Sequence, residues 1–73
     1  MLMLTLRDNL ADRLALHISS KTRGQVRDLQ VESRDRQIIL RGRSRTYYIK
    51  QVAQQAALDG SGDLMLVNEI EVY

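Results

Sequence analysis

The sequence contains no cysteine, and this absence excludes a disulfide and a thiolate metal site. Because there is also a single histidine, a metal site would have to be built largely from carboxylates, which favours weakly held hard ions. A domain of 73 residues buries only about 60% of the surface that its unfolded chain exposes. Domains this small are therefore usually stabilised by a disulfide or a bound metal ion. We therefore expect either a well-packed core or stabilisation by a partner, which includes a second copy of the chain.

Long apolar segments are also missing. No run of about 18 apolar residues is present, so no transmembrane helix is predicted. The apolar residues 1–4 have no basic leader, and Arg7 and Asp8 follow closely, which argues against a secretory signal. As written, the chain is expected to stay in the cytoplasm.

The charge of the chain is small, with a formal net charge of +2 and a sequence pI of about 9.4. This charge is too small for a protein that coats duplex nucleic acid. Most of the basic residues are arginines, whose guanidinium groups form two-pronged contacts with carboxylates and phosphates. The composition is thus compatible with an anionic partner, although a solvated surface of mixed sign explains the same charges.

Apolar residues recur every four positions from Leu6 to Ile18, which predicts an amphipathic helix with Thr5 as its N-cap. The alternation in residues 26–31 and 38–42 then predicts an antiparallel hairpin. At the turn between them Asp-Arg replaces the usual Asp-Gly. Because arginine tolerates a positive φ poorly, we expect a longer turn or one of another type.

A second helix is predicted from Arg45 or Thr46 to a break at residues 58–62, and residues 64–72 alternate as a last strand. So short a strand–helix–strand connection is expected to be right-handed, which places the last strand parallel to the second. The prediction is a single α+β domain over residues 1–73. Its order is αββαβ, with a three-stranded mixed sheet and both helices on one face. The inner stripe of the second helix is predicted to be Tyr48, Ile49, Val52, Ala53 and Ala56.

Two stretches are more specific than the periodicity of a strand requires. Residues 38–42, Ile-Ile-Leu-Arg-Gly, form a V-x-L-x-G-like pattern, and residues 66–72, Leu-Val-Asn-Glu-Ile-Glu-Val, form a V-x-N-x-I-x-V-like pattern. With Ala53 and Ala57 between them, the chain resembles the BON domain (bacterial osmotic-stress and nodulation domain) over nearly its whole length. The resemblance implies a non-catalytic module without a cofactor, associated with phospholipid membranes or with attachment inside larger envelope proteins. Members commonly lie in the periplasm or the envelope, which is the alternative to a cytoplasmic location.

Two residues of these motifs have predicted structural roles. Gly42 is expected where the second strand turns towards the helix and a side chain would collide. Asn68 falls on the apolar face of its strand, so its amide is expected to hydrogen-bond a neighbouring loop or helix end and to fix the register of the strand.

A basic cluster surrounds the end of the second strand and the start of the second helix. A helix N-terminus attracts anions, so a lipid phosphate or another polyanion is the functional hypothesis for this cluster. The alternative is pairing across the sheet with Glu69 and Glu71, which needs no ligand. The residues of the cluster are Arg41, Arg43, Arg45 and Lys50.

Apolar residues also alternate onto the outer sheet face, opposite the helices. Such a half-apolar face is a candidate surface for a protein partner or a second copy, and a normally solvated sheet is the alternative. The residues are Val26, Ile39, Met65, Val67 and Tyr73.

The leading prediction is therefore a BON-like interaction module that binds an anionic phospholipid surface or a protein partner. A structural or self-associating domain without a ligand is the second hypothesis, and weak single-stranded nucleic-acid binding is the third. Nucleic acid is disfavoured because Tyr47 and Tyr73 do not make a stacking platform. No catalytic or metal-binding residue is predicted, since His17 lacks a nucleophile or a triad-like neighbour and is assigned to packing at the helix edge.

Overall fold

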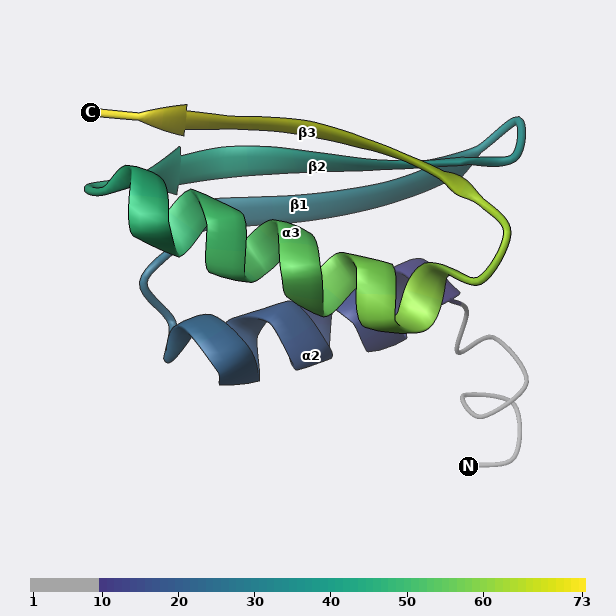
Figure 1. Ribbon diagram of the computed structural model, residues 1–73, viewed down its shortest axis with the longest axis horizontal. Coiled ribbons are helices and arrows are strands. Elements are labelled where there is room, and N and C mark those ends of the chain that lie inside the picture. The colour runs from purple at the N-terminus through teal and green to yellow at the C-terminus, as the bar shows by residue number, and fades with distance from the viewer. Residues whose placement is uncertain (1–9) are drawn as a thin grey trace.

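The computed structural model describes residues 10–73 (Figure 1). The order of the elements is αββαβ, and the three-stranded sheet has the order β1-β2-β3, with β1 antiparallel and β3 parallel to β2. This confirms the predicted α+β architecture. The predicted cap Thr5 lies outside the described residues. The elements are α2 Leu10–Thr22, β1 Arg27–Arg34, β2 Gln37–Ser44, α3 Tyr47–Ser61 and β3 Met65–Val72.

Both helices cover the same face of the sheet, as predicted (Figure 1). The two helices pack mainly against each other; on the sheet, α2 contacts mainly β1 and α3 contacts mainly β3. The core fills the space between these layers, and α3 contributes small side chains to it, which lets this helix lie close to the sheet. The fully buried apolar residues include Ile18, Ile38, Leu40, Ala53, Ala57 and Ile70.

The hairpin turn is tighter than the sequence predicts. Arg34 pairs with Gln37, so only Asp35 and Arg36 form the loop, with φ angles of 51° and 64°. Two successive residues with positive φ are typical of the hairpin turns whose twist matches that of the flanking strands. The prediction of a longer or different turn was wrong, because the match of strand twist outweighs the local cost of a left-handed arginine.

Strand β1 contains a bulge at Asp28. The pairing with β2 shifts between Arg27 and Gln30, and Asp28 has a φ of 56°. Because the extra residue reverses the alternation, Val26 points towards the helices and is buried in the core. The prediction that Val26 lies on the outer sheet face was wrong for this reason.

Gly42 lies opposite the bulge, with a φ of 152°. A Cβ atom here would lie 2.8 Å from Val26 Cγ1 and 2.9 Å from the carbonyl oxygen of Arg27. The predicted collision is confirmed, but its cause is the close approach of β1 and not a bend towards the helix.

Helix α3 begins as predicted. Thr46 is its N-cap, and the Thr46 Oγ1 atom accepts the N–H of Ile49 at 3.1 Å. The helix continues through the expected break as far as Ser61. The prediction that Tyr48 lies in the inner stripe was wrong, because this side chain is 71% exposed. Position 48 lies about 140° around the helix from the fully buried Ala53, so its side chain points away from the core.

Candidate functional site

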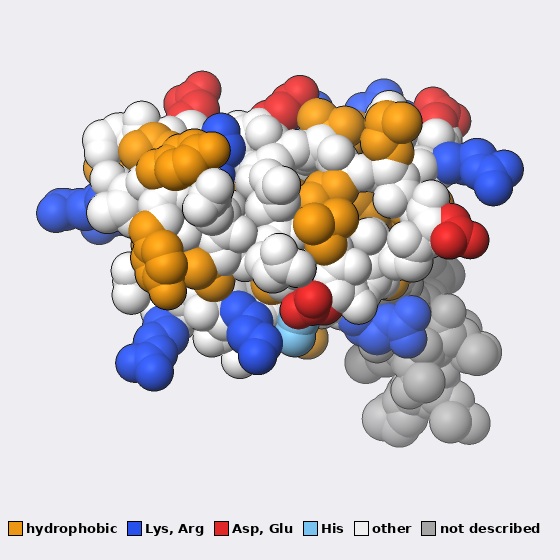
Figure 2. Space-filling view, viewed as in Figure 1, with side chains coloured by type: hydrophobic (Ala, Val, Ile, Leu, Met, Phe, Trp, Pro, Cys, Tyr) orange, Lys and Arg blue, Asp and Glu red, His pale blue; other side chains and the backbone are white. Residues whose placement is uncertain are grey.

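A chain of ion pairs crosses the outer sheet face. Arg41 donates from Nη1 to Glu32 Oε1 and from Nε to Glu69 Oε1, each at 3.1 Å, and Arg34 donates to Glu32 Oε2 at 2.8 Å. The hydrogen bond to Glu69 is the main cause that raises the pKa of Arg41 above its ordinary value. The predicted alternative of pairing across the sheet is therefore confirmed for Arg41. Acidic and basic side chains are interspersed along the top of the view in Figure 2, where β3 lies.

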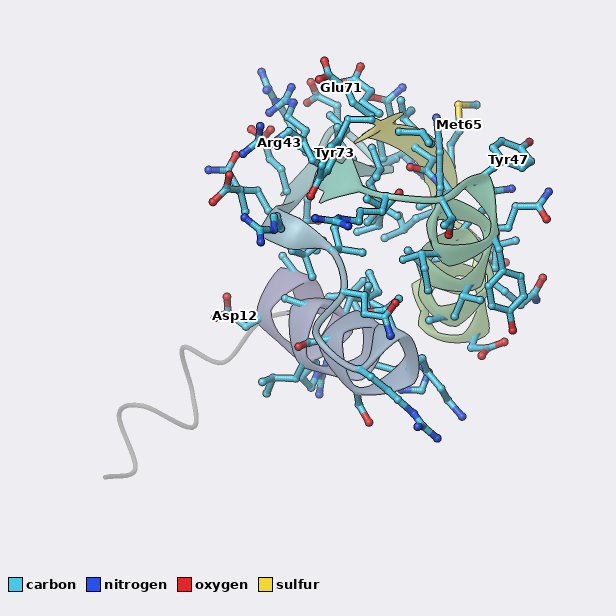
Figure 3. All side chains as sticks on the ribbon, turned by 90° about the vertical axis from the view of Figure 1, so that its left-hand side faces the viewer. Asp12, Arg43, Tyr47, Met65, Glu71 and Tyr73 are labelled. Atoms are coloured by element: carbon cyan, nitrogen blue, oxygen red, sulfur yellow. The ribbon has the colours of Figure 1, made fainter. Side chains whose placement is uncertain are left out.

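Arg43 has a different partner from the predicted one. It lies beside Glu71 in the register of the sheet, but its Nη2 atom donates to Asp28 Oδ2 at 3.2 Å. Its Cζ atom also lies 5.6 Å from the centroid of the Tyr73 ring, a cation–π distance. Figure 3 shows these two side chains at the same end of the sheet. The bulge supplies the carboxylate that Arg43 contacts.

The apolar residues of the outer face do not form one patch. Ile39 and Val67 are neighbours in the register of β2 and β3, and Ile39 is only 9% exposed. Met65 is 63% exposed and lies at the hairpin end, whereas Tyr73 is exposed at the opposite end. The ion pairs of Arg41 lie between these two ends. The structure thus brings Ile39 and Val67 together and separates Met65 from Tyr73.

Asn68 connects β3 to α3. Its Nδ2 atom donates to the carbonyl of Lys50 and to Gln54 Oε1, both at 3.3 Å, and its Oδ1 atom accepts the N–H of Ile70 at 3.0 Å. The bond from Asn68 to a helix carbonyl confirms the predicted contact with a helix. The backbone N–H of Tyr73 donates to Ser44 at the end of β2, and backbone N–H groups point to alternate sides along a strand. The N–H of Ile70, an odd number of residues away, therefore points to the free side of β3. Asn68 therefore satisfies a backbone donor at the sheet edge.

Several of the basic side chains that form no ion pair within residues 10–73 lie at one end of the domain, where the α2–β1 loop, the end of β2 and the start of α3 meet. Arg27 and Arg45 line a hollow of about 260 Å³ there, and no ion pair is formed by either within residues 10–73. We call it the Arg45 hollow. Its lining includes Gln25, Arg27, Arg45, Thr46, Ile49 and Tyr73.

A second hollow of about 370 Å³ adjoins the first, and we call it the Arg23 hollow. Its lining includes Lys21, Arg23 and Tyr48, and it shares Gln25 and Ile49 with the Arg45 hollow. Among the described residues, no acidic side chain lines either hollow, whereas the hollows further along the groove between α2 and α3 include Asp59. We call the four cations Lys21, Arg23, Arg27 and Arg45 the basic end. Figure 2 shows basic side chains projecting there, on the left of the view, and Figure 3 looks onto it.

The backbone adds to the positive potential of this end. The first turn of α3 contains no acidic residue, so no side chain there compensates the positive end of the helix dipole. Thr46, at the start of this helix, lines the Arg45 hollow. An anion in this hollow would therefore meet guanidinium groups and a favourable backbone dipole together.

The predicted basic cluster is divided by the fold. Arg41 lies within the ion pairs of the sheet, Arg43 is paired with Asp28, and Lys50 is half-buried in the first turn of α3. Of the four predicted residues, Arg45 alone lines a hollow of the basic end. Sequence reasoning missed Lys21, Arg23 and Arg27. The available signal was the density of basic residues in 21–27 together with the antiparallel pairing that returns residue 27 to the end of β2.

No helix within the described range is long and apolar enough to cross a membrane. In the same range, no three histidine, aspartate or glutamate side chains lie close enough together to hold a metal ion. In comparisons with known proteins, the sequence matches no protein-family model and no curated protein at a significant level.

Proposed function

We propose that the chain is a non-catalytic, BON-like interaction module that binds anionic phospholipid surfaces through the basic end. The observation that supports this function best is the position of Arg27 and Arg45, which form no ion pair with any residue from 10 to 73 and line one hollow at the start of α3. The resemblance of residues 38–42 and 66–72 to BON motifs supports the same class of function.

The chemistry of the basic end suits a phosphate ligand. Arginine binds phosphate oxygens through two parallel N–H donors, and these charge-assisted hydrogen bonds are stronger than neutral ones. A basic residue close to an anionic membrane contributes about 1 kcal/mol of attraction. Exposed tyrosines suit the boundary between water and lipid, and Tyr48 and Tyr73 lie at the two hollows.

A protein partner is the second candidate. Several large apolar side chains on α3 and β3 are exposed, and Figure 2 shows apolar side chains distributed over this side of the molecule. Such side chains contribute to protein interfaces when a partner removes them from water. They are Tyr47, Leu58, Met65 and Val72.

The test is co-sedimentation with vesicles of phosphatidylcholine alone and of phosphatidylcholine with phosphatidylglycerol, each at low and high salt. We expect the protein to sediment with the anionic vesicles and to be released by salt, because salt screens exposed charges. The double variant Arg27→Glu, Arg45→Glu should lose this binding, and circular dichroism should show that it is folded.

A matched control is available in Arg13→Glu, Arg36→Glu. These two arginines are exposed, form no ion pair within residues 10–73 and line neither hollow of the basic end. The control changes the net charge by the same amount and should retain most of the binding. Equal loss in both double variants would show that net charge alone governs binding, and equal sedimentation with both kinds of vesicle would refute the lipid proposal.

A further inference from the structure

The cations of the basic end occur as two pairs, one pair in each hollow. Arg27 and Arg45 line the Arg45 hollow, and Lys21 and Arg23 line the Arg23 hollow, while Lys21 also lines the neighbouring hollows that include Asp59. The two hollows share Gln25 and Ile49, so an amide and an apolar side chain stand between the two pairs. This arrangement offers two neighbouring places for an anion.

We propose that the ligand of the basic end is a lipid headgroup that carries two phosphate groups, with one phosphate in each hollow. The inference rests on the proposed function, because it names the class of lipid that the basic end selects.

One phosphodiester does not satisfy this arrangement. It carries a single negative charge on two free oxygen atoms, and one arginine can occupy both of them with parallel N–H donors. A single phosphate in the Arg45 hollow would therefore leave the cations of the Arg23 hollow without an anion. Each pair of cations lines its own hollow, and Gln25 and Ile49 line both, so the two pairs surround two neighbouring places and not one. A headgroup with two phosphates joined by a short polar bridge matches both pairs.

Local structure does not explain the arginine of the second hollow. Arg23 follows α2 with a φ of 55°, a backbone conformation that favours glycine or asparagine at the end of a helix. Arg23, like Lys21 in the last turn of α2, places a cation near the negative end of the helix dipole. This role requires a positive charge but not a guanidinium, and the Arg23 side chain lines the hollow where the second phosphate would bind.

The experiment compares vesicles that contain diphosphatidylglycerol with vesicles that contain phosphatidylglycerol, at equal lipid phosphate. We expect the protein to bind diphosphatidylglycerol about tenfold more tightly, the scale of one additional charge-assisted contact. The variant Lys21→Gln, Arg23→Gln should bind both lipids alike, with the affinity of the wild type for phosphatidylglycerol. The variant Arg27→Gln, Arg45→Gln should bind neither, and Arg13→Gln, Arg36→Gln should keep the preference.

The outcomes separate this inference from the proposed function. Binding to anionic vesicles without a preference, or a preference that persists in Lys21→Gln, Arg23→Gln, overturns the inference and leaves the proposed function intact. Absence of binding to both anionic lipids overturns both. Fructose 1,6-bisphosphate serves as a soluble probe with two phosphates. If it displaces the protein from vesicles at a concentration equal to that of the lipid phosphate, the ligand is a soluble bisphosphate and the lipid assignment is wrong.

Discussion

At the scale of single residues, positive φ angles occur where the chain departs from regular structure. In the described part of the chain, the non-glycine residues with positive φ are Arg23, Asp28, Asp35 and Arg36. They lie at the end of α2, in the bulge of β1 and in the hairpin turn. A left-handed conformation costs an ordinary L-residue roughly 1–2 kcal/mol, and aspartate tolerates it better than arginine. The arginines therefore carry the larger local cost.

The substitution Arg36→Gly should stabilise the domain. Its φ of 64° suits glycine, its side chain is exposed, and it forms no ion pair within residues 10–73. Relief of the backbone cost is partly offset by the greater freedom of glycine in the unfolded chain, so we expect a gain of about 0.5–1 kcal/mol in the free energy of unfolding. Urea denaturation measures this gain. Arg34→Gly, at a regular strand position, should destabilise instead, and a loss of stability in Arg36→Gly would contradict the cost assigned to this turn.

At the scale of elements, the two edges of the sheet are protected in different ways. The edge formed by β1 contains the bulge at Asp28 and charged side chains at Arg27 and Arg34, features that oppose pairing with another strand. The edge formed by β3 is regular over its whole pairing with β2. There, the side chain of Asn68 accepts a hydrogen bond from the N–H of Ile70 and donates one to the carbonyl of Lys50 in α3. Asn68 thus both protects the sheet edge and connects β3 to α3.

The substitutions Asn68→Ala and Asn68→Asp separate these two contributions. Alanine removes both contacts and should lower the free energy of unfolding by about 1–2 kcal/mol, because it leaves the half-buried groups around residue 68 without partners. Aspartate keeps an acceptor for Ile70 but places a carboxylate against the carbonyl of Lys50, so it should also destabilise. Self-association, measured by light scattering against protein concentration, should increase in the alanine variant only. Unchanged stability in the alanine variant would contradict the role assigned to Asn68.

At the scale of the whole molecule, the periodicity of the sequence was sufficient for the order and pairing of the elements. Apolar residues at every fourth position indicate the buried face of a helix, and alternating apolar residues indicate the buried face of a strand. The short connection from β2 through α3 constrains the direction of β3. The bulge at Asp28 and the two-residue turn depend on how neighbouring strands fit together, which no single segment records. Hence Val26 was placed on the wrong face. The basic end was missed in large part because its arginines are distant in sequence, and because register decides which arginines meet a carboxylate.

This separation of paired and unpaired arginines leads to a last prediction, in which two substitutions remove the same charge. Arg41→Gln removes a guanidinium that two carboxylates already contact, whereas Arg45→Gln removes one from a hollow that no acidic side chain of residues 10–73 lines. We expect Arg45→Gln to weaken binding to phosphatidylglycerol vesicles about tenfold, the scale of one charge-assisted hydrogen bond, and Arg41→Gln to change it less than twofold. Titration of vesicles at fixed salt gives both dissociation constants. Equal weakening would show instead that net charge governs binding, because each variant removes one positive charge and a ligand on the outer sheet face would have to displace Glu32 and Glu69 from Arg41.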